Sequence, residues 1–312
     1  LMTGSLKIVK TFENKPEGLD VSGITFTVTG PGSYERVVTY AELTNNEITI
    51  SGLIPGEYTV TESGAEIVGY DLTVTGNNTA TVTADSEAEV TINNAYAQQL
   101  TSVSGVKTWV DADNQDGIRP ASIIVNLLVV KGENEYELIT SKTVKAEDNW
   151  KYTFENLPVY DANGEKITYE VTEVAVAGYT ASYEDNNITN THIPATTEVS
   201  GEKIWDDLNN VDKTRPAEIK VNVLKGDEVV ASQTVKANED GKWLYTFTNL
   251  PKYENKGTLI NYTVSEDKVD GYTATVSGTN IVNKASLPKI AVTKTADKKA
   301  GLKDGDVVTY TI

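Results

Sequence analysis

Three kinds of side chain recur in this sequence where they could react with one another: a lysine, a glutamate and an asparagine. Each lies in the apolar phase of a segment with alternating hydrophobicity, in which successive side chains point to opposite faces of a strand. In "VSGVKTWV" (103–110), Lys107 shares a face with Val103, Gly105 and Trp109. A lysine is almost never fully buried unless it is paired, so such positions require a partner. The three sets are Lys10, Glu62 and Asn94; Lys107, Glu173 and Asn190; and Lys203, Glu266 and Asn283.

These side chains could together form an amide bond. Burial disfavours charge, so it lowers the pKa of a lysine and raises that of a glutamate by up to roughly 3–5 units. A neutral lysine amine is a nucleophile, and a protonated carboxyl group can polarise the carboxamide carbon of an asparagine. The glutamate can then relay protons until ammonia leaves, and a Lys–Asn isopeptide bond remains. The alternative reading is a buried Lys–Glu salt bridge with a satisfied asparagine nearby.

The spacing within the sets favours one recurring device. Glutamate and asparagine are 17 residues apart in two sets (190 − 173 and 283 − 266). Lysine and asparagine are separated by 84, 83 and 80 residues (94 − 10, 190 − 107 and 283 − 203). Because the first and last strands of a sandwich can be neighbours, residues this far apart in sequence can meet in one core.

The elements that must position these residues belong to an internal repeat of about 95 residues. The matching pairs of segments are 103–120 with 199–216, 150–174 with 243–267, and 177–194 with 270–288. Each unit consists of short alternating strands separated by Gly, Asn and Asp turns, which is typical of a β-sandwich. The fold class we predict is all-β, with tandem immunoglobulin-like sandwiches arranged as a rod because the connectors are short.

We predict four domains along the chain. A divergent sandwich covers 1–98, two close repeats cover 99–195 and 196–288, and 289–312 begins a further, truncated β domain. Ile290, Val292 and Lys294 share a strand phase, so Lys294 resembles an opening lysine whose partners lie outside this chain. We therefore expect it to keep a free amine, and we expect the chain to be part of a longer protein.

Composition excludes several classes of function. The 27 basic and 45 acidic residues give a formal net charge of −18, which argues against binding to nucleic acid or anionic lipid. No apolar run approaches the length needed to span a bilayer. Cysteine is absent, which removes disulfides, thiol nucleophiles and cysteine metal sites. We expect no cofactor and no metal.

Two further signals receive structural readings. The segment "DADNQDG" (111–117) has its glycine one place late for an EF-hand loop and no closing glutamate, so we interpret it as an acidic turn, while calcium binding there stays open. We predict that Arg119 and Arg215, which precede prolines, fix loops by hydrogen bonds. His192, the only histidine, lies in a connector and suggests no catalytic role.

The patterns G-x-K-x-W, Y-x-V-x-E, G-Y and I-T-N-T resemble the collagen-adhesin B-type (Cna-B) domains of Gram-positive surface adhesins and pilins. The resemblance is strong over 103–288 and looser over 4–96, because the first unit lacks the tryptophan and the Arg-Pro pair. It implies the transthyretin-like variant of the immunoglobulin sandwich. It also implies self-formed isopeptide bonds joining Lys10 to Asn94, Lys107 to Asn190 and Lys203 to Asn283, with Glu62, Glu173 and Glu266 as the catalytic carboxylates.

The function we predict is a structural stalk of a cell-surface adhesin or pilin-like protein, extracellular and anchored to the wall of a Gram-positive bacterium. The only chemistry expected is one self-directed turnover per domain, so the chain is not a conventional enzyme. We expect a monomer that makes no membrane contact, with any host matrix protein or glycan bound through regions outside this chain. Two alternatives remain, a ligand-binding adhesin module and a pilus backbone subunit. The latter would need a polymerising lysine motif and a sorting signal, and neither occurs in this sequence.

Overall fold

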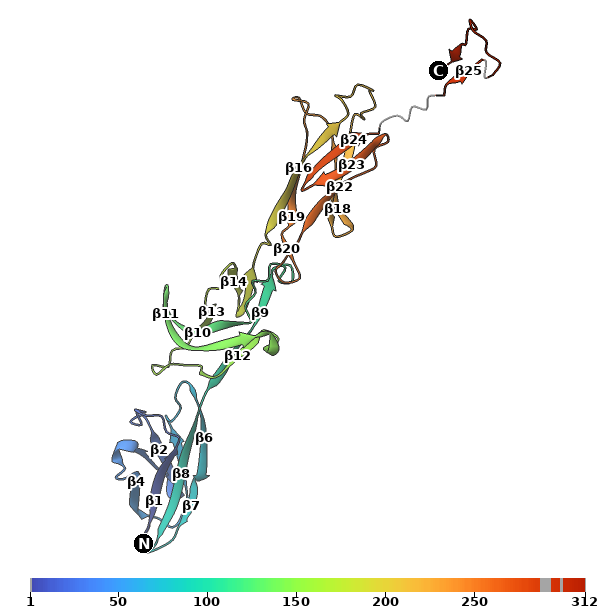
Figure 1. The fold of residues 1–312 in the computed structure, drawn as a ribbon. Coiled ribbons are helices and arrows are strands. Elements are labelled where there is room, and N and C mark those ends of the chain that lie inside the picture. Colours follow the sequence, from blue (N-terminus) through green and yellow to red (C-terminus); the bar gives the residue numbers. More distant parts are fainter. Residues whose placement is uncertain (1, 287–292, 298–299, 312) are drawn as a thin grey trace. The chain divides into compact units, whose positions relative to one another are not determined.

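The structure is a computed structural model that describes residues 2–286, 293–297 and 300–311. Every regular element longer than three residues in these ranges is a β-strand (Figure 1), so the all-β prediction is confirmed. The chain divides into two compact units, Leu1–Trp109 with Pro120–Asn190, and Val110–Arg119 with Thr191–Ile312. Within the described residues, no helix has the length and apolar character needed to cross a membrane.

The first sandwich pairs two four-stranded sheets, with strand orders β4-β1-β8-β6 and β3-β2-β5-β7. Alternate residues of β1 are buried, from Gly4 through Leu6 and Ile8 to Lys10, which is the period of two read from the sequence. The elements are β1 (Gly4–Glu13), β2 (Thr25–Gly30), η1 (Pro31–Ser33), β3 (Tyr34–Thr39), η2 (Tyr40–Glu42), β4 (Glu47–Leu53), β5 (Gly56–Ser63), β6 (Tyr70–Asn77), β7 (Thr79–Val82) and β8 (Glu87–Gln98).

The second sandwich pairs the sheets β12-β9-β15-β14 and β11-β10-β13. Its buried core includes Val125, Leu127, Phe154 and Ile188, which come from both sheets. The elements are β9 (Leu100–Val110), β10 (Ser122–Gly132), β11 (Glu135–Lys145), η3 (Ala146–Asp148), β12 (Lys151–Pro158), β13 (Tyr169–Glu173), β14 (Thr180–Glu184) and β15 (Asn187–Thr191).

The third sandwich repeats this arrangement, with sheets β19-β16-β24-β23 and β18-β17-β22 and a small hairpin β20-β21. Its core includes Val221, Val223, Phe247 and Ile281. The elements are β16 (Thr196–Asp206), β17 (Ile219–Lys225), β18 (Glu228–Val235), β19 (Trp243–Pro251), β20 (Tyr253–Glu254), β21 (Thr258–Leu259), β22 (Tyr262–Glu266), β23 (Tyr272–Ser277) and β24 (Asn280–Ala285).

The first and last strands of a sandwich are neighbours, as the sequence reasoning requires. In the first sandwich β1 runs parallel to β8, and Lys10 lies opposite Ile92. In the third, β16 runs parallel to β24, and Lys203 lies opposite Ile281. Parallel strands cannot be joined by a tight turn, so the rest of each domain forms the connection between them.

Asparagine residues occupy the turn before β4, as the Asn-rich turn sequence indicates. Asn45 and Asn46 have φ values of 53° and 65° in the two-residue turn before β4. Thr44 and Glu47 flank the turn and exchange backbone hydrogen bonds of 2.9 and 3.1 Å. Asparagine tolerates this left-handed conformation better than most residues, which makes it a frequent turn residue in two-residue hairpins.

The tail contains a short hairpin of β25 (Thr295–Ala296) and β26 (Tyr310–Thr311). The Nζ atom of Lys294 lies 3.7 Å from the centre of the Tyr310 ring. Ile290 and Val292, on which the strand phase of this segment rests, lie outside the described residues. The domain limits and the rod arrangement stay predictions.

Candidate functional site

The three lysines of the predicted sets are fully buried. Lys10, Lys107 and Lys203 expose only 1%, 2% and 1% of their surface. Each lies in the second half of the opening strand of its sandwich and points into the core with the apolar residues of its phase. The three lysines therefore lie on the apolar faces of their strands, where the sequence places them.

A glutamate reaches each lysine from the opposite sheet. The Nζ–Oε1 distances are 3.2 Å for Lys10 and Glu62, 3.8 Å for Lys107 and Glu173, and 3.3 Å for Lys203 and Glu266. The glutamate side chains expose 5%, 1% and 1% of their surface. They come from β5, β13 and β22, and the period of two in the Y-x-V-x-E segments turns them inward.

The asparagine lies on the strand next to the lysine. Asn94 is opposite Phe12 on the parallel partner, two places beyond Lys10, so lysine and asparagine are diagonal neighbours on one face. Asn283 stands in the same relation to Lys203, because it is opposite Trp205. In the second sandwich Asn190 is carried by β15, which neighbours β9 in the sheet. All three asparagines are at most 1% exposed.

Polar atoms without a hydrogen-bond partner gather at these three points. In the part of the chain that the structure describes, they include both amide atoms of Asn94, Asn190 and Asn283 and both carboxylate oxygens of the three glutamates. A buried polar atom left unsatisfied costs about 1–3 kcal/mol, and most native ones are paired. The same unsatisfied groups in all three sandwiches require a common explanation.

Burial shifts the pKa values of Lys10, Lys203 and Glu173 toward the uncharged forms. It lowers the pKa of Lys10, against the opposing charge of Glu62. It lowers the pKa of Lys203 to about 8, again against the effect of its glutamate, Glu266. Burial raises the pKa of Glu173, although the Asn190 amide and the Lys107 charge act in the other direction. The cause is the same in each case, because the core replaces water with apolar contacts.

An aromatic ring two residues after each lysine covers the amine. Lys107 Nζ lies 4.0 Å from the Trp109 ring centre, and Lys203 Nζ lies 3.9 Å from that of Trp205. In the first sandwich Phe12 takes this place, at 4.7 Å from Lys10 Nζ. All three rings are themselves partly buried.

Further aromatic residues, which the sequence reasoning did not assign, complete this cover. Trp205 packs edge-to-face against Trp243 at 5.3 Å and against Tyr272 at 4.9 Å. Trp109 packs in the same way, at the same distances, against Trp150 and Tyr179. The sequence feature that could have indicated these contacts is the recurrence of W-x-Y-T-F and G-Y in both repeats.

The two Arg-Pro arginines fix loops, as predicted. Arg119 makes a two-pronged pair with Asp111, with Nε–Oδ2 at 3.0 Å and Nη2–Oδ1 at 2.6 Å. Arg215 and Asp207 repeat it at the same distances. The Asp111 carboxylate is thus already occupied, which favours the acidic-turn interpretation of 111–117. No group of three or more potential metal ligands occurs in the described ranges.

His192 also has a structural role. Its Nε2 lies 2.9 Å from Asp116 Oδ2, and the Ala195 N–H donates to the same oxygen at 2.7 Å. The histidine therefore helps to hold the connector that leads into β16.

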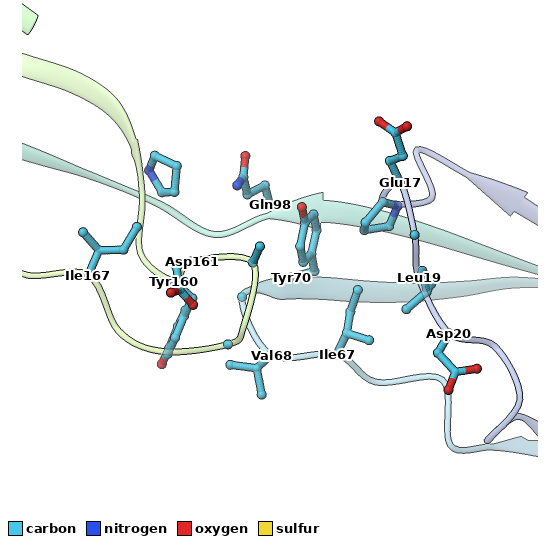
Figure 2. A pocket seen from close by; sticks show the side chains of 16 residues that line it. Glu17, Leu19, Asp20, Ile67, Val68, Tyr70, Gln98, Tyr160, Asp161 and Ile167 are labelled. Atoms are coloured by element: carbon cyan, nitrogen blue, oxygen red, sulfur yellow. The ribbon is translucent and has the colours of Figure 1, made fainter. Parts of the chain in front are cut away.

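The pocket in Figure 2 is separate from these sites. It has a volume of about 600 Å³, lies in the first unit and is lined by residues that include Leu19, Ile67, Tyr70 and Tyr160. None of the nine predicted site residues lines it.

Comparison with known proteins gives consistent results for all three sandwiches. The profile of the Cna protein B-type domain matches 103–191 and 199–284, and that of a prealbumin-like fold domain matches 4–96. The collagen adhesin of Staphylococcus aureus is 39% identical over 228 residues, which make up 73% of this chain and 18% of that protein. The chain therefore spans less than a fifth of the length of this curated relative.

Solved structures are similar as well. A crystal structure of two B repeat units of the Staphylococcus aureus collagen-binding protein matches 91% of this chain and 74% of its own, with 31% identity and a TM-score of 0.54. A single B repeat unit of the same protein is 40% identical and matches 61% of this chain and all of its own, with a TM-score of 0.28. The tandem prealbumin-like arrangement agrees with the sandwiches described above.

Proposed function

Because the chain belongs to the Cna protein B-type domain family, we propose that it is a load-bearing stalk in which each sandwich cross-links itself. The bonds would join Lys10 to Asn94, Lys107 to Asn190 and Lys203 to Asn283. The observation that carries this proposal is the repeated burial of a lysine, a glutamate and an asparagine together, with amide and carboxylate atoms that lack other partners.

The arrangement favours a covalent bond over a buried salt bridge. A salt bridge would account for the lysine and the glutamate, but it gives no role to the buried asparagine, whose amide atoms have no hydrogen-bond partner outside this site. An isopeptide bond removes the lysine charge and replaces the asparagine NH₂ group by a secondary amide. The carbonyl oxygen that remains can accept a hydrogen bond from a protonated glutamate.

The reaction balances without a cofactor. The neutral lysine Nζ attacks the asparagine Cγ and forms a C–N bond, and the carbonyl oxygen becomes a transient oxyanion stabilised by the glutamic acid proton. The glutamate takes a proton from Nζ and delivers one to the leaving Nδ2. The Cγ–Nδ2 bond then breaks and one ammonia leaves per sandwich. The lowered pKa of Lys203 and the raised pKa of Glu173 favour the protonation states that this sequence needs.

A bond at these positions would suit a stalk. It would join the opening and closing strands, so tension along the chain would pass through the bond and would not separate the sheets between them. It would also close a loop of about 80 residues, for which the chain-entropy treatment of cross-links gives roughly 4.5 kcal/mol. A chain without cysteine would gain this stability independently of redox conditions.

The setting that we propose follows from the relatives. The similar Staphylococcus aureus protein is a collagen adhesin, and this chain matches its repeat units over most of its own length. We infer an extracellular, wall-anchored protein of a Gram-positive bacterium whose contact with host matrix lies outside these sandwiches.

The carboxylate role can be tested one domain at a time. We expect Glu266→Ala to leave the fold intact and to abolish the Lys203–Asn283 bond only, because the glutamate supplies the proton relay. Glu173→Ala should act in the same way on Lys107–Asn190. Peptide mapping by mass spectrometry detects the linked peptides, and the affected domain should also show lower thermal stability and faster tryptic cleavage.

A matched control is Glu228→Ala, which changes an exposed glutamate of the third sandwich. It should keep all three bonds. A third domain that still loses ammonia in the Glu266→Ala variant would show that the carboxylate is assigned wrongly.

A further inference from the structure

A tyrosine in the second and third sandwiches fastens the start of the closing strand. Tyr245 of β19 lies directly opposite Gly201 of β16. Its hydroxyl passes over this glycine and donates a hydrogen bond to the carbonyl oxygen of Thr279, the residue before β24. Tyr152, opposite Gly105, makes the same bond to the carbonyl oxygen of Asn186, the residue before β15.

The glycine of G-x-K-x-W is required by this contact. A Cβ atom added at Gly201 would lie 2.5 Å from Tyr245 Oη and closer still to the Thr279 carbonyl oxygen. The same holds at Gly105, with Tyr152 and Asn186. The motif therefore leaves space for a side chain that crosses the opening strand to reach the closing strand.

The first sandwich lacks the tyrosine and does not need it. Ile8 and Ile48 form the corresponding cross-strand pair. There β8 pairs with β1 from Glu87 onward, seven residues before Asn94, so the backbone ladder itself sets the register of the asparagine. In the third sandwich the ladder between β16 and β24 begins only at Ile281, two residues before Asn283.

Side chains replace the missing part of that ladder. Besides the Tyr245 bond, the Asn280 side chain accepts a hydrogen bond from the Glu202 N–H at 2.9 Å. The Thr279 hydroxyl donates to the Ser200 carbonyl oxygen at 2.6 Å. These bonds hold the first residues of β24 against β16, immediately before the reacting asparagine.

We propose that Tyr245 and Tyr152 are positioning residues for the cross-linking reaction, an inference that rests on the proposed function. Each hydroxyl fixes the start of a short closing strand, so that Asn283 or Asn190 stands beside its lysine. Misplacing a reacting atom by about 1 Å can slow a reaction by up to about 100-fold. A hydroxyl that bonds the chain four residues before the asparagine (283 − 279 and 190 − 186) can therefore control the rate without touching the reacting atoms.

The test compares the Tyr245→Phe variant with the unchanged 312-residue chain. Both are made by cell-free synthesis, and the linked fraction of each domain is followed by peptide mass spectrometry. We expect linking of the third domain to slow by about tenfold or more. Linking of the second domain in the same molecules should keep its rate, because Tyr152 is intact.

Three comparisons separate positioning from other roles. Tyr262→Phe removes a hydroxyl that bonds the Pro251 carbonyl at 2.8 Å, away from the closing strand, and should link at the unchanged rate. A positioning role should lower the rate at every pH, whereas a proton-transfer role would shift the midpoint of the pH profile. In a Glu266→Gln background, which cannot link, adding Tyr245→Phe should change the melting temperature only slightly.

The outcomes distinguish the two proposals. If the unchanged third domain never loses ammonia, the proposed function fails. If the unchanged third domain does lose ammonia, two results would overturn the positioning role alone. One is that the Tyr245→Phe variant links as fast as the unchanged chain, and the other is that it shifts the midpoint of the pH profile. A large loss of melting temperature in the unlinked background would likewise reduce Tyr245 to a stabilising role.

Discussion

A single buried lysine changes the energetics of a domain according to whether its amine is free. Lys203 is 1% exposed and lies 3.3 Å from Glu266, and its burial lowers its pKa. If the amine reacts with Asn283, the charge is removed permanently from the core. The unreacted domain should therefore be recognisable by its response to pH.

The Asn283→Ala variant should show that response. Burial lowers the pKa of Lys203 to about 8 in the folded chain, whereas an unfolded lysine titrates near its ordinary value of 10.5. Between these values the unfolded state binds more protons, so the free energy of unfolding of the variant third domain should rise as the pH increases through this range. The unchanged chain, with its nitrogen in an amide, should lack this increase.

Urea denaturation at several pH values, followed by tryptophan fluorescence, measures the difference. The same pH dependence in both chains would mean that Lys203 is not the reacting amine.

At the scale of elements, an arginine–aspartate pair holds the loop after the opening strand in the second and third sandwiches. Asp207 is 7% exposed and binds Arg215 through both oxygens, while Tyr272 donates to Oδ2 at 3.1 Å. The Arg215 pair is the first cause of the lowered pKa of Asp207. Removing the arginine leaves a buried carboxylate with fewer partners.

We expect Arg215→Ala to destabilise the third domain by about 1–3 kcal/mol, the usual cost of leaving a buried polar group unsatisfied. The control is Arg36→Ala, whose partner Glu42 is well exposed in the first sandwich, as is Arg36 itself. Exposed pairs contribute about 0–1 kcal/mol, so this variant should change little. Equal melting temperatures for the Arg215→Ala variant and the unchanged chain would contradict the role assigned to the loop.

Strand phase was sufficient to predict which residues point into the core. Lys10, Glu62 and Asn94 were identified by their phase and spacing, and the structure buries all three together. The period of two makes this possible, because it assigns a face to every residue of a strand. The internal repeat added the spacing that linked the sets.

Register between distant strands could not be predicted in the same way. The contact of Tyr245 with the Thr279 carbonyl depends on β19 lying beside β16 with Tyr245 opposite Gly201. The sequence shows a glycine and a tyrosine 44 residues apart (245 − 201), and nothing local indicates that they meet. The aromatic cover of Trp205 by Trp243 and Tyr272 was missed for the same reason.

For the molecule as a whole, the tail provides an internal comparison. Lys294 shares its residue type with the three lysines that we propose to react, but within the described ranges its close neighbour is the exposed Tyr310 ring. We expect Lys294 to keep a free amine. Amine labelling of the unfolded chain, followed by peptide mapping, should modify Lys294 and leave Lys10, Lys107 and Lys203 unmodified. A cross-link from Lys294 to another residue of this chain would contradict this.

The intact mass of the unchanged chain tests the central claim most directly. Each isopeptide bond releases one ammonia and adds nothing, so the account predicts a mass below that of the sequence by three ammonia molecules. Denaturation should not restore the difference, because the bonds are covalent. A mass equal to that of the unmodified sequence would contradict the claim that these sandwiches cross-link themselves.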